Sequence, residues 1–346
     1  RALLRPPWPT RATPSPAELF GRGNTPHRFP MIEYRPFRED DILGIVNVKN
    51  AVNQSLGVKL MTTLQEITEE LSPPYVSADD DVFCAEENGT LLGYAHTYFV
   101  DSTEKEVRCY VLGGTHPAHV GRGIGTALTT RAIGRARQLL ESGAPALPRR
   151  LRSDIPVNDT AAAALLTDLG FAPVRWFHDL VRPLSTLPGI TCPEGFRILP
   201  WDASRNEELR AVKNAAFTDH WGSTPTSADG WNQMTAGWGS RTDLSFMALD
   251  NQDRVVGLLL THRYPDDDAL LNGAYGWIDK IATLQEFRAR GIASALITIA
   301  LHAYAAEGLT HAALNADGDN PTGAFRLYGT LGFVPFRGTV NYELIG

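Results

Sequence analysis

The chain has few cysteines and no long apolar segment. Its 346 residues include three cysteines, Cys84, Cys109 and Cys192. None of them shows the Cys-x-x-Cys spacing of a zinc or redox motif, and three thiols cannot all pair with one another. We therefore expect reduced thiols in a cytoplasmic protein and no metal site. No apolar run approaches the roughly 18 residues that a membrane-spanning helix needs, so we expect no membrane partner.

Positive charge is also in short supply. Lys and Arg number 32 against 39 Asp and Glu, which gives a formal net charge of −7. Because no Lys- or Arg-rich face stands out, we do not expect nucleic acid as a partner. The acidic balance is compatible with an amine substrate. The hydrophobic share of 43% and the charged share of 21% are typical of a soluble globular protein, and the length suits two domains.

Residues 1–30 differ in kind from the rest. This stretch bears several prolines and arginines and shows no hydrophobic periodicity. It lacks the apolar core of a secretory signal. Met31 then precedes Ile-Glu-Tyr-Arg-Pro-Phe-Arg, which is typical of a first strand. We interpret residues 1–30 as an upstream, non-native extension or as a Pro-rich arm that packs on the body of the protein.

The most informative pattern is a strand that runs into a helix within residues 278–296. The strand covers Ile278 to Thr283, and the helix opens within Arg288-Ala-Arg-Gly-Ile-Ala-Ser294. A Gly-containing turn at a helix start leaves backbone N–H groups unpaired at the positive end of the helix dipole, where they can bind phosphate. The spacing is neither Gly-x-Gly-x-x-Gly nor a P-loop, which disfavours dinucleotide and ATP sites.

A second pattern lies downstream, where residues 320–333 read Asn-Pro-Thr-Gly-Ala-Phe-Arg-Leu-Tyr-Gly-Thr-Leu-Gly-Phe. Asn320 can cap a helix that has proline at its first position. Apolar residues then recur at helical spacing through Tyr328, and Gly332 is placed to end the helix before a strand that begins at Phe333.

Together the two patterns resemble the GNAT family of N-acetyltransferases. Arg-x-x-Gly-x-Ala after a strand is similar to that family's coenzyme A pyrophosphate loop, and Asn-x-x-x-Ala-x-x-Leu-Tyr-x-x-x-Gly-Phe is similar to its last helix. The resemblance implies acetyl-coenzyme A as the acyl donor. It implies the following cofactor-binding residues: Ile281, Ala282, Thr283, Arg288, Ala289, Arg290, Gly291, Ile292, Ala293, Ser294 and Asn320. A backbone N–H within Ile281–Thr283 would polarise the thioester carbonyl, and Tyr328 would protonate the departing thiolate.

The first half of the chain repeats this arrangement. Gly123 corresponds to Gly291, and Gly170-Phe171 corresponds to Gly332-Phe333. We therefore predict an α/β (α+β) protein made of two tandem GNAT domains, each with a mixed, mostly antiparallel sheet flanked by helices. The predicted boundaries are an N-terminal domain at 31–183, a linker at 184–194 and a C-terminal domain at 195–346.

The two copies differ where chemistry would need them to agree. Val120 stands in place of Arg288, and Leu166 stands in place of Tyr328. We therefore predict that the N-terminal domain does not catalyse acetyl transfer. It either holds coenzyme A by backbone amides or serves as a packing partner. The residues that would hold coenzyme A there are Gly121, Arg122, Gly123, Gly125 and Thr126.

The acceptor side and the base follow from the resemblance less directly. The early helices of the second copy would cover the acceptor cleft, so Asp219, His220 and Trp221 are candidate substrate contacts, or else ordinary loop and core residues. A tandem member of the family carries Glu where Trp277 stands. Trp277 and Asp279 share a strand face. Trp277 is therefore a further candidate substrate contact. Asp279 is a candidate base with a pKa raised by burial, or a salt-bridge partner.

The function that these residues favour is transfer of acetyl from acetyl-coenzyme A to a primary amine of a small polar molecule, directly in a ternary complex. One alternative is an antibiotic, aminosugar or natural-product N-acyltransferase that uses another acyl-coenzyme A. A different class is a non-catalytic, coenzyme A-binding sensor or scaffold. The expected assembly is a monomer or a homodimer. The acceptor and the acyl chain length are left open by the sequence.

Overall fold

The computed structural model describes residues 31–319 and 323–344. The predictions for residues 1–30 and for Asn320 lie outside them. The N-terminal half holds β1 (Glu33–Pro36), α1 (Asp41–Ser55), α2 (Leu64–Glu70), α3 (Ala78–Asp81), β2 (Val82–Glu87), β3 (Thr90–Val100), β4 (Val107–Thr115), α4 (Ile124–Ser142), β5 (Arg149–Pro156), α5 (Thr160–Asp168) and β6 (Phe171–Pro183).

The C-terminal half repeats this order except for its short helix, since α3 precedes β2 whereas α8 lies between β9 and β10. It holds β7 (Phe196–Pro200), α6 (Asn206–Ala216), α7 (Ala228–Ala236), β8 (Phe246–Asp250), β9 (Val255–His262), α8 (Asp268–Leu271), β10 (Tyr275–Thr283), α9 (Ile292–Ala306), β11 (His311–Asp317), α10 (Ala324–Thr330) and β12 (Val334–Leu344). Short 3₁₀ turns lie between them, including Gln285–Phe287 just after β10.

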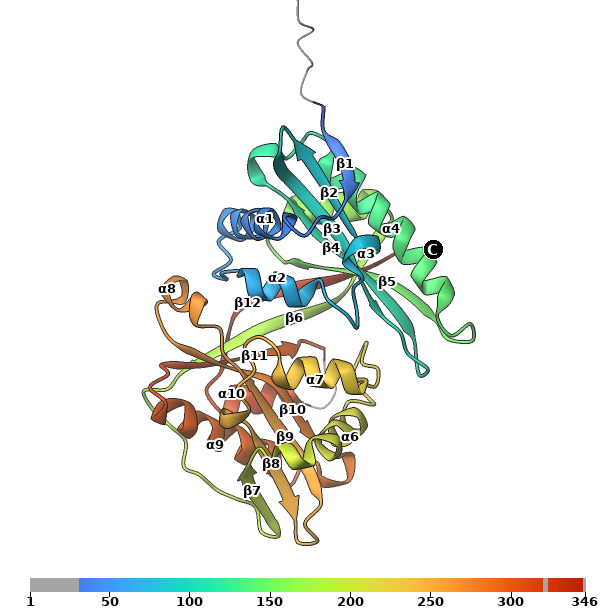
Figure 1. The fold of residues 1–346 in the computed structure, drawn as a ribbon. Coiled ribbons are helices and arrows are strands. Elements are labelled where there is room, and N and C mark those ends of the chain that lie inside the picture. Colours follow the sequence, from blue (N-terminus) through green and yellow to red (C-terminus); the bar gives the residue numbers. More distant parts are fainter. Residues whose placement is uncertain (1–30, 320–322, 345–346) are drawn as a thin grey trace, which may run out of the picture.

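A single sheet joins the two halves. Its strand order is β1-β2-β3-β4-β5-β12-β6-β11-β10-β9-β8-β7. Among the described strands, only the pairs β4–β5 and β10–β11 are parallel. The predicted fold class, mixed and mostly antiparallel sheets flanked by helices, is therefore confirmed. Figure 1 shows β6 and β12 running between the upper and lower halves of the molecule.

The last strands of the two halves are exchanged. Strand β12, the end of the C-terminal half, lies between β5 and β6, with Val340 opposite Ile155. Strand β6, the end of the N-terminal half, pairs in turn with β11, where Leu180 lies opposite Leu314. Each hydrophobic core therefore contains side chains from the other half: Val340 and Tyr342 lie in the N-terminal core, and Leu180 lies in the C-terminal core.

Each half has one place where two parallel strands diverge. Strands β10 and β11 pair over Tyr275–Ile278 and His311–Leu314, after which β10 stays with β9 and β11 stays with β6. Strands β4 and β5 likewise pair over Val107–Tyr110 before they part. This opening leaves backbone groups of β10 near Ile281 without a neighbouring strand on one side.

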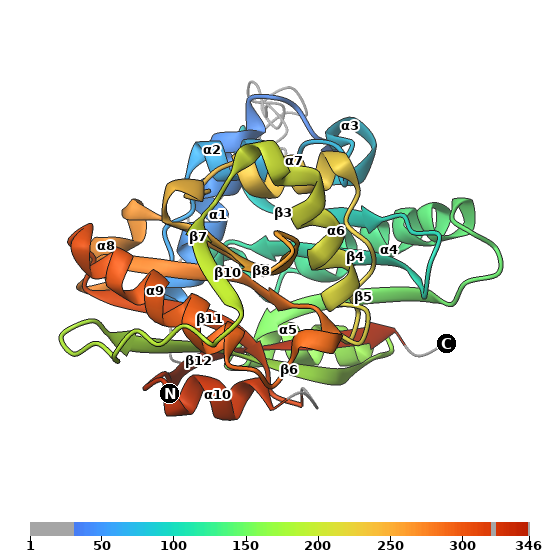
Figure 2. The ribbon, with the colours of Figure 1, turned by 90° about the horizontal axis from the view of Figure 1, so that it is seen from below.

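The helices α2 and α7 meet between the halves (Figure 2). The side-chain amide of Gln233 donates to the carbonyl of Glu69 at 3.2 Å, and the backbone N–H of Trp238 donates to the Glu69 carboxylate at 2.5 Å. The backbone N–H of Met61 donates to the carboxylate of Asp267 at 2.6 Å. These contacts hold the N-terminal half over the face of the C-terminal half.

The exchanged strand makes the stability of the N-terminal half depend on a distant residue. Tyr342 is 8% exposed in the N-terminal core, so Tyr342→Ala should lower the free energy of unfolding by about 3–5 kcal/mol. Hydrogen-exchange protection should fall in α4 and β5. Val334→Ala, at the exposed start of the same strand, is the control and should cost less than about 0.5 kcal/mol. Loss of protection confined to β10 and β11 would contradict the exchange.

Candidate active site

The turn that opens α9 has two residues in the left-handed region. Ala289 has φ 61° and Gly291 has φ 83°. The corresponding turn before α4 is closely similar, with φ 78° at both Gly121 and Gly123. Such a turn at a helix start presents several backbone N–H groups to one point, and this arrangement binds anions. The turn that the sequence predicts at the start of each helix is therefore present in both halves, and phosphate binding at these turns stays a prediction.

A buried, unpartnered hydroxyl marks the end of β10. The Oγ1 atom of Thr283 has no hydrogen-bond partner among the described residues. Arg288 follows and bends back over this point, with its Nε 3.4 Å from the Thr283 carbonyl. Its other nitrogens donate to the carbonyl of Ala216 at 2.7 Å and to the carboxylate of Asp219 at 3.3 Å. An unsatisfied donor beside a cation and an open turn fits a phosphate-bearing ligand.

The remaining predicted loop residues divide between the surface and the core. The Arg290 guanidinium lies over the ring of Phe287, 5.4 Å from its centre. Ile292 is 1% exposed and packs in the C-terminal core, so its side chain is structural. Ala293 and Ser294 are half-buried in the first turn of α9.

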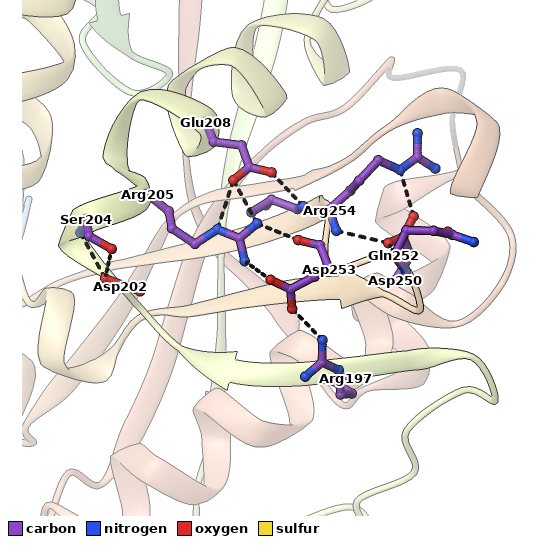
Figure 3. Close-up of polar contacts among 10 residues, drawn as sticks. Arg197, Asp202, Ser204, Arg205, Glu208, Asp250, Gln252, Asp253 and Arg254 are labelled. Atoms are coloured by element: carbon purple, nitrogen blue, oxygen red, sulfur yellow. Dashed lines mark hydrogen bonds and ion pairs between the residues drawn. The ribbon is translucent and has the colours of Figure 1, made fainter.

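Helix α6, whose last residue Ala216 accepts from Arg288, is held at its start by an ionic network (Figure 3). Arg205 donates to the carboxylate of Glu208 at 2.8 Å and to the carbonyl of Asp253 at 2.5 Å. The other carboxylate oxygen of Glu208 accepts from the backbone N–H of Val255, the first residue of β9, at 2.9 Å. The network ties the start of α6 to the turn between β8 and β9.

A cleft of about 720 Å³ lies where the two halves face each other. The C-terminal half lines it with α6, the segment 220–227, and the diverging ends of β10 and β11. The N-terminal half lines it with β3, β4 and the segment after α2. The residues that line the cleft include Tyr75, Tyr98, Arg108, Tyr110, Lys213, His220, Trp221, Asp279, Lys280, Ile281 and Tyr328. The cleft is therefore lined by both halves.

Tyr328 lies in this cleft, as the sequence predicts for an acid. It comes from α10, is 7% exposed, and packs edge-on against Phe333 with ring centres 6.3 Å apart. Burial raises the pKa of Tyr328 to about 12. Its hydroxyl therefore keeps its proton at neutral pH and is able to donate it.

Asp279 also lies in the cleft, but its electrostatics differ from the expectation. It is the extra residue of a bulge, because the pairing with β9 skips from Ile278 to Lys280. Its carboxylate accepts a hydrogen bond from Lys280 Nζ at 2.9 Å. Burial alone would raise the pKa of Asp279, but the charges of Lys280 and Lys213 hold it below the usual value. The expectation of a raised pKa is wrong, because the sequence does not show these cations.

The four predicted substrate contacts separate into two pairs. His220 and Trp221 line the cleft: His220 stacks on Phe217, and the Arg152 guanidinium lies 4.2 Å from the centre of the Trp221 ring. Burial lowers the pKa of His220.

Asp219 and Trp277 do not line the cleft. Asp219 pairs with Arg288 instead. Trp277 is 9% exposed and packs against Phe336, beneath the guanidinium of Arg337. Trp277 lies on the paired part of β10, before the strand diverges from β11.

The N-terminal half has its own pocket of about 470 Å³ at the equivalent turn. Gly121, Gly123, Gly125 and Thr126 line it, together with Leu166. Arg122 lies outside the lining, because its guanidinium pairs with the carboxylate of Glu87 at 2.5 Å.

Sequence reasoning missed the wall that the N-terminal half contributes. Arg108 and Tyr110 flank the buried Cys109 on β4, so period-two alternation places them on the opposite face of that strand. In the repeat they stand where the second copy has Gly276 and Ile278. That contrast of large polar residues with a glycine and an isoleucine was the available signal.

The match to known proteins agrees with this geometry. A sequence model of the acetyltransferase (GNAT) family matches residues 59–171 and 206–333. The chain belongs to the GNAT acetyltransferase family. It is an acyltransferase, and both halves carry the family's domain. The mycothiol acetyltransferase of Frankia casuarinae is 30% identical over 268 residues, which cover 74% of this chain and 72% of that protein.

Solved GNAT structures share the fold. A GCN5-related N-acetyltransferase from Sphaerobacter thermophilus superposes with a TM-score of 0.72 at 20% identity, over 90% of this chain and 95% of that one. A tandem GNAT protein from the clavulanic acid biosynthesis pathway gives a TM-score of 0.70 at 15% identity, over 90% and 98%. At these identities the likeness concerns the fold and its tandem repeat.

The described part of the chain contains neither a metal-binding cluster nor a membrane-spanning helix. No group of three or more His, Cys, Asp or Glu side chains in residues 31–319 and 323–344 is arranged to hold a metal ion. No helix in the same ranges has the length and apolar character to cross a membrane.

Because Ala289 and Gly121 both have left-handed backbone conformations, replacing alanine by glycine and glycine by alanine should have opposite effects on stability. Ala289 pays a conformational penalty that glycine avoids, so Ala289→Gly should leave stability unchanged or raise it by up to about 1 kcal/mol. Gly121→Ala, at the matched position, should lower stability by about 1 kcal/mol. Urea unfolding measures both. Clear destabilisation by Ala289→Gly would contradict this backbone geometry.

Proposed function

We propose that the protein transfers acetyl from acetyl-coenzyme A to a primary amine of a small polar molecule, directly and in a ternary complex. The main support for this proposal is the extent of the cleft. It extends from the wall of the N-terminal half to the divergence of β10 and β11, where Ile281 and Tyr328 line the same space. An amine in the cleft would lie beside the place where the family's thioester is bound.

The donor would bind along the end of β10 and the start of α9. Backbone N–H groups around Gly291, with the Arg288 guanidinium, would hold the pyrophosphate. A backbone N–H within Ile281–Thr283 would polarise the acetyl carbonyl, because β10 has no partner strand there on one side. Bound acetyl-coenzyme A supplies an activated thioester, and the chain supplies orientation and charge stabilisation.

Tyr328 and Asp279 would handle the protons. Tyr328 is protonated at neutral pH and would donate to the leaving thiolate. Asp279 is ionised over the same range, because its pKa is lowered. Its carboxylate would orient the incoming ammonium and pass its proton to solvent through a water molecule, since a carboxylate of low pKa does not hold a proton. Both residues lie in one cleft, which supports the pairing.

The N-terminal half would bind coenzyme A without turnover. Its pocket carries the left-handed Gly121 and Gly123 and the start of a long helix, which fit a pyrophosphate. Leu166 lines that pocket where an acid would be needed, and a leucine side chain has no proton to give. We further propose a cytoplasmic monomer or homodimer.

The proposed function is tested by thiol release from acetyl-coenzyme A over a panel of amines. Because relatives are named mycothiol acetyltransferases, deacetylated mycothiol belongs in the panel with aminosugars and amino-acid derivatives. Turnover on at least one amine is expected. Tight coenzyme A binding with no turnover on any of them would favour a sensor or scaffold instead.

The same assay tests the acid. Tyr328→Phe keeps the ring and its packing against Phe333, so stability should change little. Turnover should fall roughly 10²–10⁴-fold, the usual range for a lost general acid, while affinity for acetyl-coenzyme A stays nearly constant. Leu166→Met in the N-terminal pocket is the control, because it nearly conserves side-chain volume in the core, and it should leave turnover near wild type. Turnover of Tyr328→Phe near half of wild type would contradict the assignment of one catalytic half.

A further inference from the structure

The wall that the N-terminal half contributes to the cleft contains an arginine with free hydrogen-bonding capacity. Arg108 lines the cleft, and its side chain is 13% exposed. Its Nε and Nη1 atoms have no hydrogen-bond partner among the described residues. A largely buried guanidinium with two unsatisfied donors is costly unless a ligand satisfies it.

The arginine cluster around Arg108 has two carboxylates in close contact, and Asp154 in the same cleft acts on Arg108 and Arg152 only through longer-range electrostatics. Arg108, Arg150 and Arg152 share two carboxylates, those of Glu106 and Glu343. Arg152 donates to Glu106 at 2.7 Å and to Glu343 at 2.9 Å, and Arg150 donates to Glu343 at 2.8 Å. Arg108 lies 3.7 Å from Glu106, beyond hydrogen-bond distance. Arg108, which lines the cleft, is therefore farther from its nearest carboxylate than the other two arginines are from theirs, and no carboxylate of the described residues is hydrogen-bonded to it.

A second cation faces the same space from the C-terminal half. Lys213 on α6 is 5% exposed and lines the cleft. Its ammonium group donates to the Thr226 hydroxyl at 2.5 Å and to the side-chain oxygen of Asn214 at 3.4 Å. No carboxylate in the described part of the chain lies within ion-pair distance of it. Burial and the charges of Lys280 and Arg108 lower the pKa of Lys213 to about 8.

The segment 221–227 connects the two cations. A Cβ atom at Gly222 would lie 3.8 Å from Arg108 Nη1, and Thr226 of the same segment accepts from Lys213. Lys280 is different, since its ammonium group already pairs with Asp279. Tyr98, stacked on Tyr75 with ring centres 4.6 Å apart, completes this side of the cleft with a flat surface.

We propose that the acceptor carries an anionic group in addition to its amine, and that Arg108 and Lys213 bind this group. Its chemistry is that of a carboxylate or a phosphate ester, which a guanidinium can bind with two parallel hydrogen bonds. The amine then lies toward Asp279 and Tyr328, which line the same cleft. This inference rests on the proposed function, since it assigns the acceptor class of the same site.

The test compares matched acceptors that differ only in the anionic group. The pairs are glucosamine 6-phosphate with glucosamine, for phosphate, and glycylglycine with glycylglycinamide, for carboxylate. With saturating acetyl-coenzyme A, at least one anionic member should show a higher kcat/KM than its neutral partner. Binding calorimetry of the same pairs gives a readout that does not need turnover. Equal values within both pairs, or a preference for the neutral members, would overturn the proposal.

Arg108→Gln makes the comparison specific. It should lower kcat/KM for the preferred anionic acceptor roughly 10- to 100-fold, mainly through KM, and leave the neutral partner almost unchanged. Arg150→Gln is the matched control, because Arg150 belongs to the same cluster and does not line the cleft. An equal loss for both members of a pair would assign Arg108 a structural role and overturn the proposal.

The pH dependence of KM for the anionic acceptor provides a second test. Lys213 is charged below its pKa of about 8 and neutral above it, so KM for the anionic acceptor should rise as pH passes 8. The groups facing Lys213 are Arg108 from β4 and Asp279 and Lys280 from β10. Lys213→Met should remove the step. Absence of turnover on every amine would sink the proposed function, whereas turnover without these charge effects would sink only the acceptor class.

Discussion

The exchange of the last strands is the constraint on which the rest of the structure depends. Because β12 lies between β5 and β6, and β6 pairs with β11, one hydrogen-bonded sheet runs through both halves. The halves cannot shift against each other without breaking this ladder. Strand β4 is therefore held opposite the divergence of β10 and β11, and the space between them becomes the cleft. The contacts of α2 with α7 close one side of it.

The parts of the molecule that sequence could predict are those with local causes. Short sequence patterns predict the Gly-containing turn before α9, its repeat before α4, and the strand that follows Gly332. Strand exchange leaves no such pattern in the sequence. The residues of β12 would show the same alternation whether the strand paired with β6 alone or lay between β5 and β6. The same limit applies to the cleft. Tyr328 was predicted from its motif and Asp279 from its place on a strand, whereas Arg108 and Lys213 come together only through long-range packing. The lowered pKa of Asp279 depends on Lys280 and Lys213 and was missed for that reason.

Duplication has left two copies with the same backbone and different chemistry. Both turns hold left-handed residues at matched positions, although one copy uses glycine and the other uses Ala289. The N-terminal copy has Val120 and Leu166 where the C-terminal copy has Arg288 and Tyr328. Its strand β4 contributes Arg108 and Tyr110 to the lining of the cleft. Under the proposed function, the C-terminal half would supply the reactive groups and the N-terminal half would shape the cleft that leads to them.

The central claim is that both halves form one acceptor site. Hydrogen exchange with and without an acceptor that is turned over, in the presence of coenzyme A, tests it most directly. If both halves form the site, the acceptor should protect β3 and β4 of the N-terminal half as well as segment 220–227 and β10 of the C-terminal half. Protection confined to the C-terminal half would contradict the claim and would leave the N-terminal half as a packing partner alone.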